Sequence, residues 1–368
     1  MPRIFLLLLL LLPLLLAGTR AHRRESRYAP RSVSGAASGD DRGDDLASVF
    51  LRLYSGYDAS RFADAPLRQA GDLLRWMNVS KPTVIYVHGY TGSIDSRDTR
   101  AVVAGKPSAA AAVELAHWTR AESARCLAYA ERGDHNVIAT DWRRLAGQSY
   151  PSVAGSARLV GRALAGAVDE MVGKGLPPRT IHVVGHSMGA QVAGQLGRHA
   201  SFQLSRITGL DPAGPLFNLI QPHLSRDDAR FVDTIHTDAG LYGINRPSGA
   251  ASFFPNGGRR VQPGCPTAYD LGSPEDYCSH HRSWMYYAES LRDEGAFVAT
   301  NCTSYGAYAR GSCDANARAP MGLAAPTGLS GVFYLRTRRE APFGMRAEGA
   351  TCGDAASPGE RTFDLHCG

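Results

Sequence analysis

Short apolar runs alternate with helical stretches through the middle of the chain. Five runs have the length of buried strands, at residues 83–87, 137–140, 181–184, 207–210 and 231–236. Between the second and third runs, apolar residues recur every three or four positions from Leu159 to Met171, which predicts a crossover helix. Residues 50–54 and 331–335 are predicted to form an early and a late strand. Such a pattern predicts an α/β fold over about residues 45–345, with a doubly wound, mostly parallel sheet covered by helices on both faces.

Polar residues of chemical interest follow the ends of these predicted strands. The segment His88-Gly89-Tyr90-Thr91-Gly92 follows the first strand, and Asp141, Ser187 and Asp211 follow the next three. Ligands of open parallel sheets bind at the carboxyl ends of the strands. The sequence therefore predicts a single site at this edge of the sheet.

Ser187 lies at the centre of the sequence Gly185-His186-Ser187-Met188-Gly189, directly after a predicted strand. Met188, Val192 and Leu196, at four-residue steps, predict a helix after it. Glycines two residues before and two after the serine let the strand and the helix pack closely around a sharp turn, which exposes the serine hydroxyl. This context predicts a serine hydrolase.

A serine hydroxyl becomes a strong nucleophile when a base accepts its proton and an acid orients that base. In this fold the expected chain order is serine, acid, histidine. The predicted acid is Asp211, which directly follows a strand in Gly209-Leu210-Asp211-Pro212-Ala213-Gly214-Pro215. Asp233 and Asp238 are rivals, although Asp233 lies inside a strand pattern, where its side chain is a less natural partner for a distant histidine.

The chain contains twelve histidines, and the predicted base is His280 in Cys278-Ser279-His280-His281-Arg282-Ser283. His280 follows a cysteine-closed loop and precedes an aromatic helical stretch. His281 is adjacent, and the local sequence does not exclude it as the base. His186 beside the nucleophile and His88 in the glycine-rich loop are too strained or too early in the chain to be the acid-paired base.

The oxyanion that forms during acyl transfer needs two backbone N–H donors. The serine turn supplies the amide of Met188, and the glycine-rich loop offers the amide of Tyr90. Because the second donor belongs to the main chain, we expect side-chain replacements of Tyr90 to be tolerated and a proline to be harmful.

The two ends of the chain have the composition of appendages. Residues 1–21 have the basic start, leucine-rich core and small-residue end of a secretory signal peptide. Residues 22–44 are rich in Arg, Ser, Gly and Asp, which predicts a flexible leader or pro-segment, and residues 346–368 form a cysteine-containing tail. We therefore expect a secreted, extracellular protein. The formal charge of +6 favours an anionic surface only weakly, and no nucleic-acid partner is expected.

Seven cysteines in an exported chain indicate disulfides. Neighbours in sequence are predicted to pair: Cys265 with Cys278, Cys302 with Cys313, and Cys352 with Cys367. Cys126 is then left without a partner, and the apolar, helix-like pattern around it predicts a buried small apolar side chain rather than a reactive thiol. The spacings do not match zinc ligand sets, so no metal is assigned. Asn78 and Asn301 lie in glycosylation acceptor sequences, Asn78-Val79-Ser80 and Asn301-Cys302-Thr303.

Together these motifs resemble the pancreatic-type lipases, secreted α/β hydrolases that include phospholipase A1 and insect lipase branches. The resemblance covers about residues 50–345, through the motifs already described and the segments at residues 231–238 and 254–258. It implies that Ser187, Asp211 and His280 form the catalytic triad, which selects His280 over His281. It also implies that the amides of Tyr90 and Met188 form the oxyanion hole.

Four departures from the family pattern refine this expectation. Only twelve residues separate Cys265 from Cys278, and the loop between His236 and Phe254 is short, both as in the phospholipase A1 branch. No room for a C-terminal β-sandwich follows residue 345, so no colipase-type partner is expected. In the segment that matches the family's structural calcium loop, Asp228 matches one carboxylate ligand but Ser225 replaces another, which disfavours a calcium site.

The sequence thus predicts a secreted serine lipase that works through an acyl-enzyme, needs no cofactor, and meets its lipid substrate at a membrane or lipid-droplet interface. Phospholipase A1 activity on glycerophospholipids is slightly favoured, with triacylglycerol or galactolipid hydrolysis as close alternatives. Two other classes stay open: a non-catalytic, yolk-protein-like lipid-binding protein and a carboxylesterase for soluble esters. The oligomeric state is not predicted.

Overall fold

The computed structural model of the protein describes residues 45–55, 61–104, 129–219 and 222–352. The predicted signal peptide, the predicted leader, Cys126 and Cys367 therefore lie outside the described residues. Within the described part of the chain, no helix combines the length and the apolar character needed to cross a membrane.

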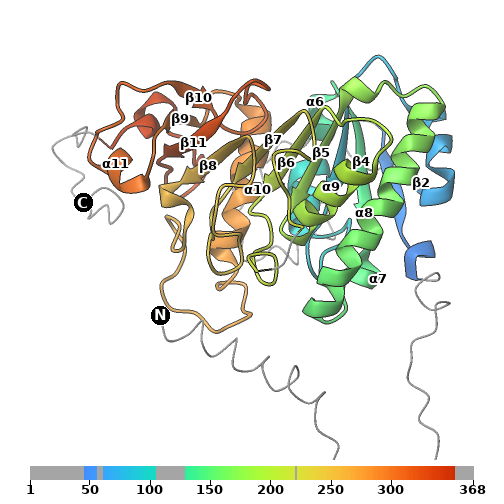
Figure 1. The fold of residues 1–368 in the computed structure, drawn as a ribbon, viewed down its shortest axis with the longest axis horizontal. Helices are drawn as coiled ribbons and strands as arrows, with labels where there is room; N and C mark the ends of the chain where they lie inside the picture. Colours follow the sequence, from blue (N-terminus) through green and yellow to red (C-terminus); the bar gives the residue numbers. More distant parts are fainter. Residues whose placement is uncertain (1–44, 56–60, 105–128, 220–221, 353–368) are drawn as a thin grey trace, which may run out of the picture. The chain divides into compact units, whose positions relative to one another are not determined.

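The described residues form one sheet of eleven strands, in the spatial order β10-β9-β11-β8-β7-β6-β5-β3-β4-β1-β2 (Figure 1). In chain order the strands are β1 (Phe50–Tyr54), β2 (Phe62–Pro66), β3 (Thr83–Val87), β4 (Asn136–Asp141), β5 (Ile181–His186), β6 (Arg206–Leu210), β7 (Phe231–Ile235), β8 (Ala251–Pro255), β9 (Val298–Asn301), β10 (Arg318–Pro320) and β11 (Gly331–Leu335).

The middle of this sheet is parallel and its two edges are antiparallel. Each neighbouring pair from β4 through β3, β5, β6, β7 and β8 to β11 is parallel, whereas β1 and β2 at one edge and β9 and β10 at the other pair antiparallel. Every residue of the parallel strands β3 to β8 is buried, which fits a sheet covered on both faces.

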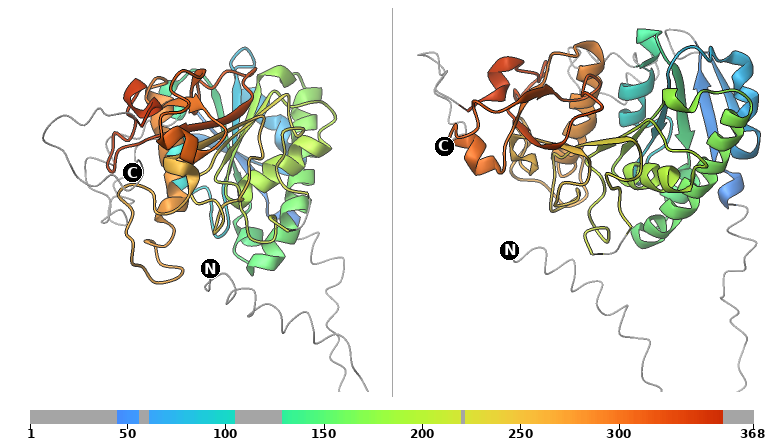
Figure 2. Two further views of the ribbon diagram at one scale, coloured as in Figure 1. Left: turned by 60° about the vertical axis from the view of Figure 1, so that its left-hand side comes forward. Right: turned by 45° about the horizontal axis from the view of Figure 1, so that its top comes forward.

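Two layers of helices cover the sheet. The helices α8 (Tyr150–Gly173) and α9 (Met188–His199) lie on one face with η1 (Leu67–Trp76), and α10 (Cys278–Arg292) lies on the other face (Figure 2). Shorter segments are α3 (Arg97–Thr99), η2 (Arg100–Ala104), α6 (Tyr129–Arg132), α7 (Arg143–Ala146), η3 (Pro178–Thr180), η4 (Asn256–Gly258), α11 (Tyr305–Ala309) and η5 (Ala347–Ala350).

The crossover helix α8 packs tightly on α9 because one glycine permits close approach. A Cβ atom on Gly161 would lie 2.4 Å from the Cβ of Gln195 and 2.7 Å from the carbonyl oxygen of Val192. A larger residue at position 161 would therefore push α8 away from α9, the helix that begins directly after Ser187.

The predicted α/β-hydrolase architecture is confirmed, and the seven predicted strands correspond to β1, β3, β4, β5, β6, β7 and β11. The crossover helix is confirmed and is longer than its apolar pattern. The strands β2, β8, β9 and β10 were not predicted. The two at the β10 edge contain only three or four residues, which is too short for a periodic signal, and β2 is an exposed edge strand that ends in a proline.

Two of the predicted disulfides, Cys265–Cys278 and Cys302–Cys313, are present. Cys352 is also disulfide-bonded, and its predicted partner Cys367 lies outside the described residues. The start of the predicted tail packs on the sheet, since Thr300 Oγ1 donates a 2.6 Å hydrogen bond to the carbonyl oxygen of Ala350.

Candidate active site

Ser187 occupies a strained turn between β5 and α9. Its φ of 54° and ψ of −120° lie outside the usual regions for a residue with a side chain. The flanking glycines make the turn possible, because a Cβ atom on Gly185 would lie 2.4 Å from the Gly189 carbonyl oxygen, and one on Gly189 would lie 2.1 Å from the Val87 carbonyl oxygen. The turn therefore has the geometry that the sequence predicts for an exposed nucleophile.

The turns that carry Ser187 and Asp211 are hydrogen-bonded to each other. The Ser187 amide donates to the Leu210 carbonyl oxygen at 2.9 Å, and the Ala213 amide donates to the Ser187 carbonyl oxygen at 3.0 Å. Since His186 and Leu210 are register partners in β5 and β6, the residue after each strand is held beside the other. Main-chain bonds thus fix the spacing of the predicted nucleophile and the predicted acid.

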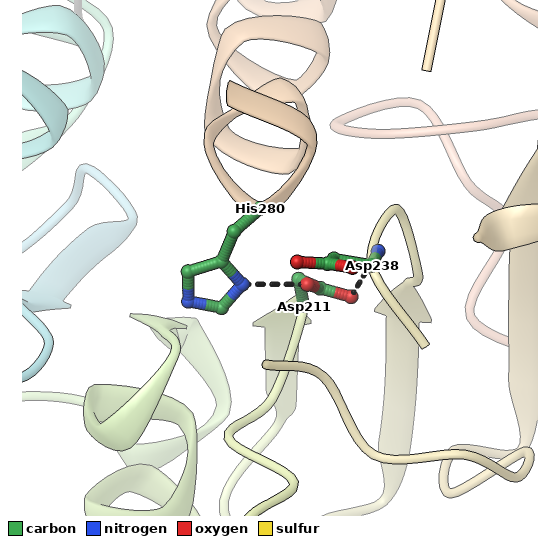
Figure 3. A group of neighbouring side chains, drawn as sticks. All are labelled: Asp211, Asp238 and His280. Carbon is green, nitrogen blue, oxygen red and sulfur yellow. Dashed lines mark hydrogen bonds and ion pairs between the residues drawn. The ribbon is translucent and has the colours of Figure 1, made fainter. Parts of the chain in front are cut away.

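His280 lies in the first turn of α10 and contacts Asp211 directly. Its Nδ1 donates a 2.6 Å hydrogen bond to Asp211 Oδ2, while Asp211 Oδ1 accepts from the amides of Thr237 at 2.9 Å and Asp238 at 3.1 Å (Figure 3). Because Nδ1 carries the proton, Nε2 is the free acceptor, and Figure 3 shows it directed away from both carboxylates. This is the tautomer that a general base for a serine hydroxyl requires.

Burial controls the charge of both groups. It lowers the pKa of His280 to about 4, so the imidazole is neutral near pH 7. Burial raises the pKa of Asp211, and the two amides that bind its Oδ1 oppose this by stabilising the carboxylate. Among the described residues, the hydroxyl of Ser187 has no hydrogen-bond partner, so its bond with His280 is not formed here. Catalytic hydrogen bonds are often loose without substrate and tighten when it binds.

The segments that carry the two predicted oxyanion donors border the Ser187 turn. A Cβ atom on Gly89 would lie 2.9 Å from the Cβ of Ser187, so the loop after β3 packs against the serine turn. In that loop the amides of Thr91 and Gly92 donate to carbonyl oxygens, whereas the Tyr90 amide has no acceptor among the described residues. Met188 is the first residue of α9, where amides point out of the helix.

Three other histidines near Ser187 have positions different from that of His280. His88 is stacked on Trp142, its Nδ1 donates to the Gly89 carbonyl oxygen at 3.0 Å, and its Nε2 accepts from the Trp142 amide at 3.2 Å, so it holds the loop after β3. His281 is half-buried beside Trp284, and no contact joins it to Asp211. The structure therefore brings His280, not His281, to the acid.

The third histidine, His186, belongs to a buried cluster that the sequence did not reveal. Its Nδ1 lies 3.4 Å from Asp98 Oδ2, and the same oxygen accepts a 2.8 Å hydrogen bond from the Tyr86 hydroxyl. The rings of His186 and His280 are 4.8 Å apart. Burial alone would raise the pKa of Asp98, but hydrogen bonding and charge from His186 lower it to about 2. The buried negative charge of Asp98 therefore lies beside His186, whose ring is next to that of His280.

The two rival acids have other partners. Asp233 accepts two hydrogen bonds from Arg206, from Nε at 2.8 Å and Nη2 at 2.9 Å, and lies away from His280 inside β7. Asp238 lies beside Asp211, but its carboxylate forms a bidentate ion pair with Arg260. Possible ligand atoms of Asp211, Asp238 and His280 lie within 4.8 Å of one another. Because these atoms already bond to protein groups, the cluster does not fit a metal site.

The segment that matches the family's calcium loop does not fit a calcium ion either. Asp228 Oδ2 accepts a 2.8 Å hydrogen bond from Arg198 Nη2 and another of 2.8 Å from the Ser225 amide. The same guanidinium donates to the His223 carbonyl oxygen. A fixed cationic side chain thus takes up the oxygen ligands that a divalent ion would need.

The two predicted glycosylation residues differ in setting. Asn78 is exposed, with Oδ1 accepting from the Ser80 amide at 3.0 Å. Asn301 is half-buried at the end of β9, and its Nδ2 donates to the Val332 carbonyl oxygen at 3.2 Å. Asn78 is therefore the better placed acceptor.

The parallel sheet and the strained serine turn at its carboxyl edge place the protein among the α/β hydrolases. Comparison with known proteins narrows this class. The sequence model of the family described as Lipase matches residues 74–343, and the chain belongs to this family.

Three relatives show the extent of the similarity. The chain is 36% identical over 254 residues to Lipase member H of Oryctolagus cuniculus, which covers 68% of this chain and 51% of that protein. It is 36% identical to the pancreatic triacylglycerol lipase of Oryctolagus cuniculus, with 55% of this chain and 49% of that protein covered. It is 37% identical to the lipoprotein lipase of Sus scrofa, with 58% of this chain and 50% of that protein covered. The chain spans about half the length of these curated relatives.

Proposed function

We propose that the protein is a secreted lipase that hydrolyses carboxylic esters of lipids through Ser187, His280 and Asp211. The observation that carries this proposal is the buried 2.6 Å hydrogen bond from His280 Nδ1 to Asp211 Oδ2, at the edge where Ser187 occupies its strained turn. Membership of the lipase family supports it. The disulfides Cys265–Cys278 and Cys302–Cys313 support an oxidising compartment.

In the acylation step, Ser187 Oγ attacks the ester carbonyl carbon while His280 Nε2 accepts the hydroxyl proton. Asp211 keeps the proton on Nδ1 and stabilises the imidazolium that forms. The carbonyl oxygen becomes an oxyanion and receives hydrogen bonds from the Tyr90 and Met188 amides. When the tetrahedral intermediate collapses, the bond to the alcohol oxygen breaks, and His280 donates its proton to the leaving alcohol.

Deacylation reverses the same proton transfers with water. His280 Nε2 accepts a proton from a water molecule as its oxygen attacks the acyl-enzyme, and the proton then returns to Ser187 Oγ as the fatty acid leaves. The low pKa of His280 keeps the ring neutral, and ready to act as a base, before each of these steps.

The loops beside the site support the proposed substrate class. Leu219, on the loop after Asp211, is 77% exposed, and Leu271, in the loop closed by Cys265–Cys278, is 78% exposed. Exposed aliphatic side chains on loops at the carboxyl edge of the sheet suit contact with a membrane or lipid-droplet surface. The short disulfide-closed loop supports phospholipase A1 activity on glycerophospholipids, because a smaller loop obstructs a polar headgroup less.

A lipid panel tests this assignment. We expect purified protein to release the first acyl chain of phosphatidylcholine faster than it hydrolyses triolein, and Ser187→Ala to abolish both activities. Equal or faster triolein turnover would support a triacylglycerol lipase instead. Retained lipid binding without any turnover by the wild type would support a lipid-binding protein, and turnover confined to soluble esters would support a carboxylesterase.

A further inference from the structure

A largely buried arginine lies next to the acid of the site. Arg260 Nε donates to Asp238 Oδ1 at 2.7 Å, and its Nη2 donates to Asp238 Oδ2, which makes a bidentate ion pair. The Asp238 side chain is fully buried and the Arg260 side chain is 15% exposed. The amide of the same Asp238 donates to Asp211 Oδ1. Asp238 therefore links Arg260 to Asp211, the carboxylate that orients His280.

The other side of the same guanidinium holds the disulfide-closed loop. Arg260 Nη1 donates to Asp276 Oδ1 at 2.7 Å and to the Tyr269 hydroxyl at 2.9 Å, and Nη2 donates to the Asp276 carbonyl oxygen at 3.1 Å. Asp276 is buried and also accepts from the Tyr242 hydroxyl. The Tyr242 ring lies 5.7 Å from the His280 ring. One cation thus joins the loop to the surroundings of the predicted base.

The charge balance at this point depends on Arg260. Two buried carboxylates, Asp211 and Asp238, lie side by side (Figure 3), and like charges at such a distance cannot both stay ionised without compensation. Arg260 supplies that compensation on the Asp238 side, leaving Asp211 free to pair with His280. The neighbouring Arg259 is exposed.

The groups that face His280 come from several elements. They are Asp211 after β6, Asp238 and Tyr242 after β7, Arg260 after β8, His186 in β5, Asp98 in α3 and His281 in α10. Among these, Asp238 and Asp98 favour the protonated imidazole, and Arg260 disfavours it.

Building on the proposed ester hydrolysis, we propose that Arg260 is a positioning residue of this site: it neutralises Asp238 beside Asp211 and fastens the disulfide-closed loop next to His280. Its removal exposes His280 and Asp211 to the uncompensated charge of Asp238. The pKa of His280 then rises, because a nearby cation is lost and a nearby anion is unbalanced. The pKa of Asp211 rises for the second reason. Both changes move the acid limb of activity to higher pH.

The test compares Arg260→Met with Arg259→Met as the matched control, using the full chain and a soluble p-nitrophenyl ester. We expect the acid limb of kcat/KM to rise by about one pH unit in Arg260→Met and to stay unchanged in Arg259→Met. In the double variant Arg260→Met with Asp238→Asn, the net charge is restored and the limb should return close to the wild-type position. If Arg260→Met does not fold, Arg260→Gln, which removes the charge but keeps hydrogen-bond donors, takes its place with the same expected rise, whereas Arg260→Lys, which keeps the charge, should leave the limb near the wild-type position.

Titration of the His280 ring by NMR provides a readout that does not need turnover. The proposal predicts an upward shift of its pKa in Arg260→Met and reversal in the double variant. A lower kcat with an unmoved acid limb and an unmoved His280 titration would show that Arg260 only supports the fold and would overturn the proposal. If the wild type hydrolyses no ester, the proposed function fails, but the NMR titration still decides the role of Arg260.

Discussion

His280 and Asp211 share a 2.6 Å hydrogen bond although they are 69 positions apart in the chain. The bond depends on two independent placements: β6 ends at Leu210 and presents Asp211, and α10 begins at Cys278 and presents His280. The disulfide Cys265–Cys278 fixes the start of α10 two residues before the imidazole. The geometry of the base is thus set by the sheet edge and a covalent link together.

Replacing Tyr90 should separate the roles of its side chain and its amide. Tyr90→Phe keeps the N–H and the ring contact with Tyr150, so we expect nearly wild-type ester hydrolysis. Tyr90→Pro removes the N–H and should lower kcat by about 10²-fold. Steady-state kinetics on a soluble ester, with thermal unfolding to show that both variants fold, checks this. Equal activity of the two folded variants would exclude the Tyr90 amide from the oxyanion hole.

Asp98→Asn should move the pH profile in the direction opposite to that of Arg260→Met. The Asp98 carboxylate favours protonated His280, so its loss lowers the pKa of His280 and shifts the acid limb of kcat/KM to lower pH. Asp95→Asn, at an exposed position, is the control. An unchanged or raised acid limb in Asp98→Asn would show that its charge does not reach the imidazole.

The same carboxylate makes a second, separate prediction about stability. The pKa of Asp98 in the folded protein is about 2, below its ordinary value of 3.8. A depressed pKa means that its stabilisation is fully present above about pH 4 and is lost as pH falls toward 2. Urea unfolding of wild type and Asp98→Asn should therefore differ most above pH 4 and converge below it. A difference that is constant from pH 7 to pH 2 would contradict the depressed pKa.

Chelation should leave the protein unaffected, because Arg198 pairs with Asp228 in the segment that matches the calcium loop. We expect EDTA to change neither ester hydrolysis nor the melting temperature. Arg198→Met leaves the buried Asp228 without its cation and should lower the free energy of unfolding by roughly 2 kcal/mol, less than for a fully buried pair because Arg198 is partly exposed. Arg162→Met, on the exposed side of α8, should have little effect. Inactivation by EDTA with recovery on added Ca²⁺ would refute this interpretation.

Leu271→Ser should weaken activity at a lipid surface without changing the chemistry. Loss of its exposed aliphatic side chain should lower binding to phosphatidylcholine vesicles several-fold, while hydrolysis of a soluble ester stays unchanged. Val79→Ser is the control, since Val79 is also exposed but precedes β3 and so lies at the opposite edge of the sheet. Vesicle flotation measures the binding, and equal losses in both variants would argue against a specific docking role.

Much of the fold followed from the sequence, because buried parallel strands are nearly continuous apolar runs and the serine turn is encoded in five consecutive residues. Asp211 was predictable because it directly follows a strand. The choice between His280 and His281 was not available from local physics. It depends on how α10 rotates over the sheet, and only the resemblance selected His280.

The supporting polar groups were not predicted at all. Asp98 lies in a polar segment without periodic pattern, and its partners Tyr86 and His186 come from two different strands. Arg260 has one partner after β7 and another in the disulfide-closed loop. Such contacts arise from tertiary packing between distant segments, and no local pattern in the sequence records them.

The most direct test of the account is labelling with a fluorophosphonate probe followed by peptide mapping. The account predicts a single covalent adduct on Ser187 in the wild type, none in Ser187→Ala, and labelling slowed by several orders of magnitude in His280→Gln. A folded wild-type protein that stays unlabelled, or that is labelled equally fast without His280, would contradict the central claim that His280 and Asp211 activate Ser187.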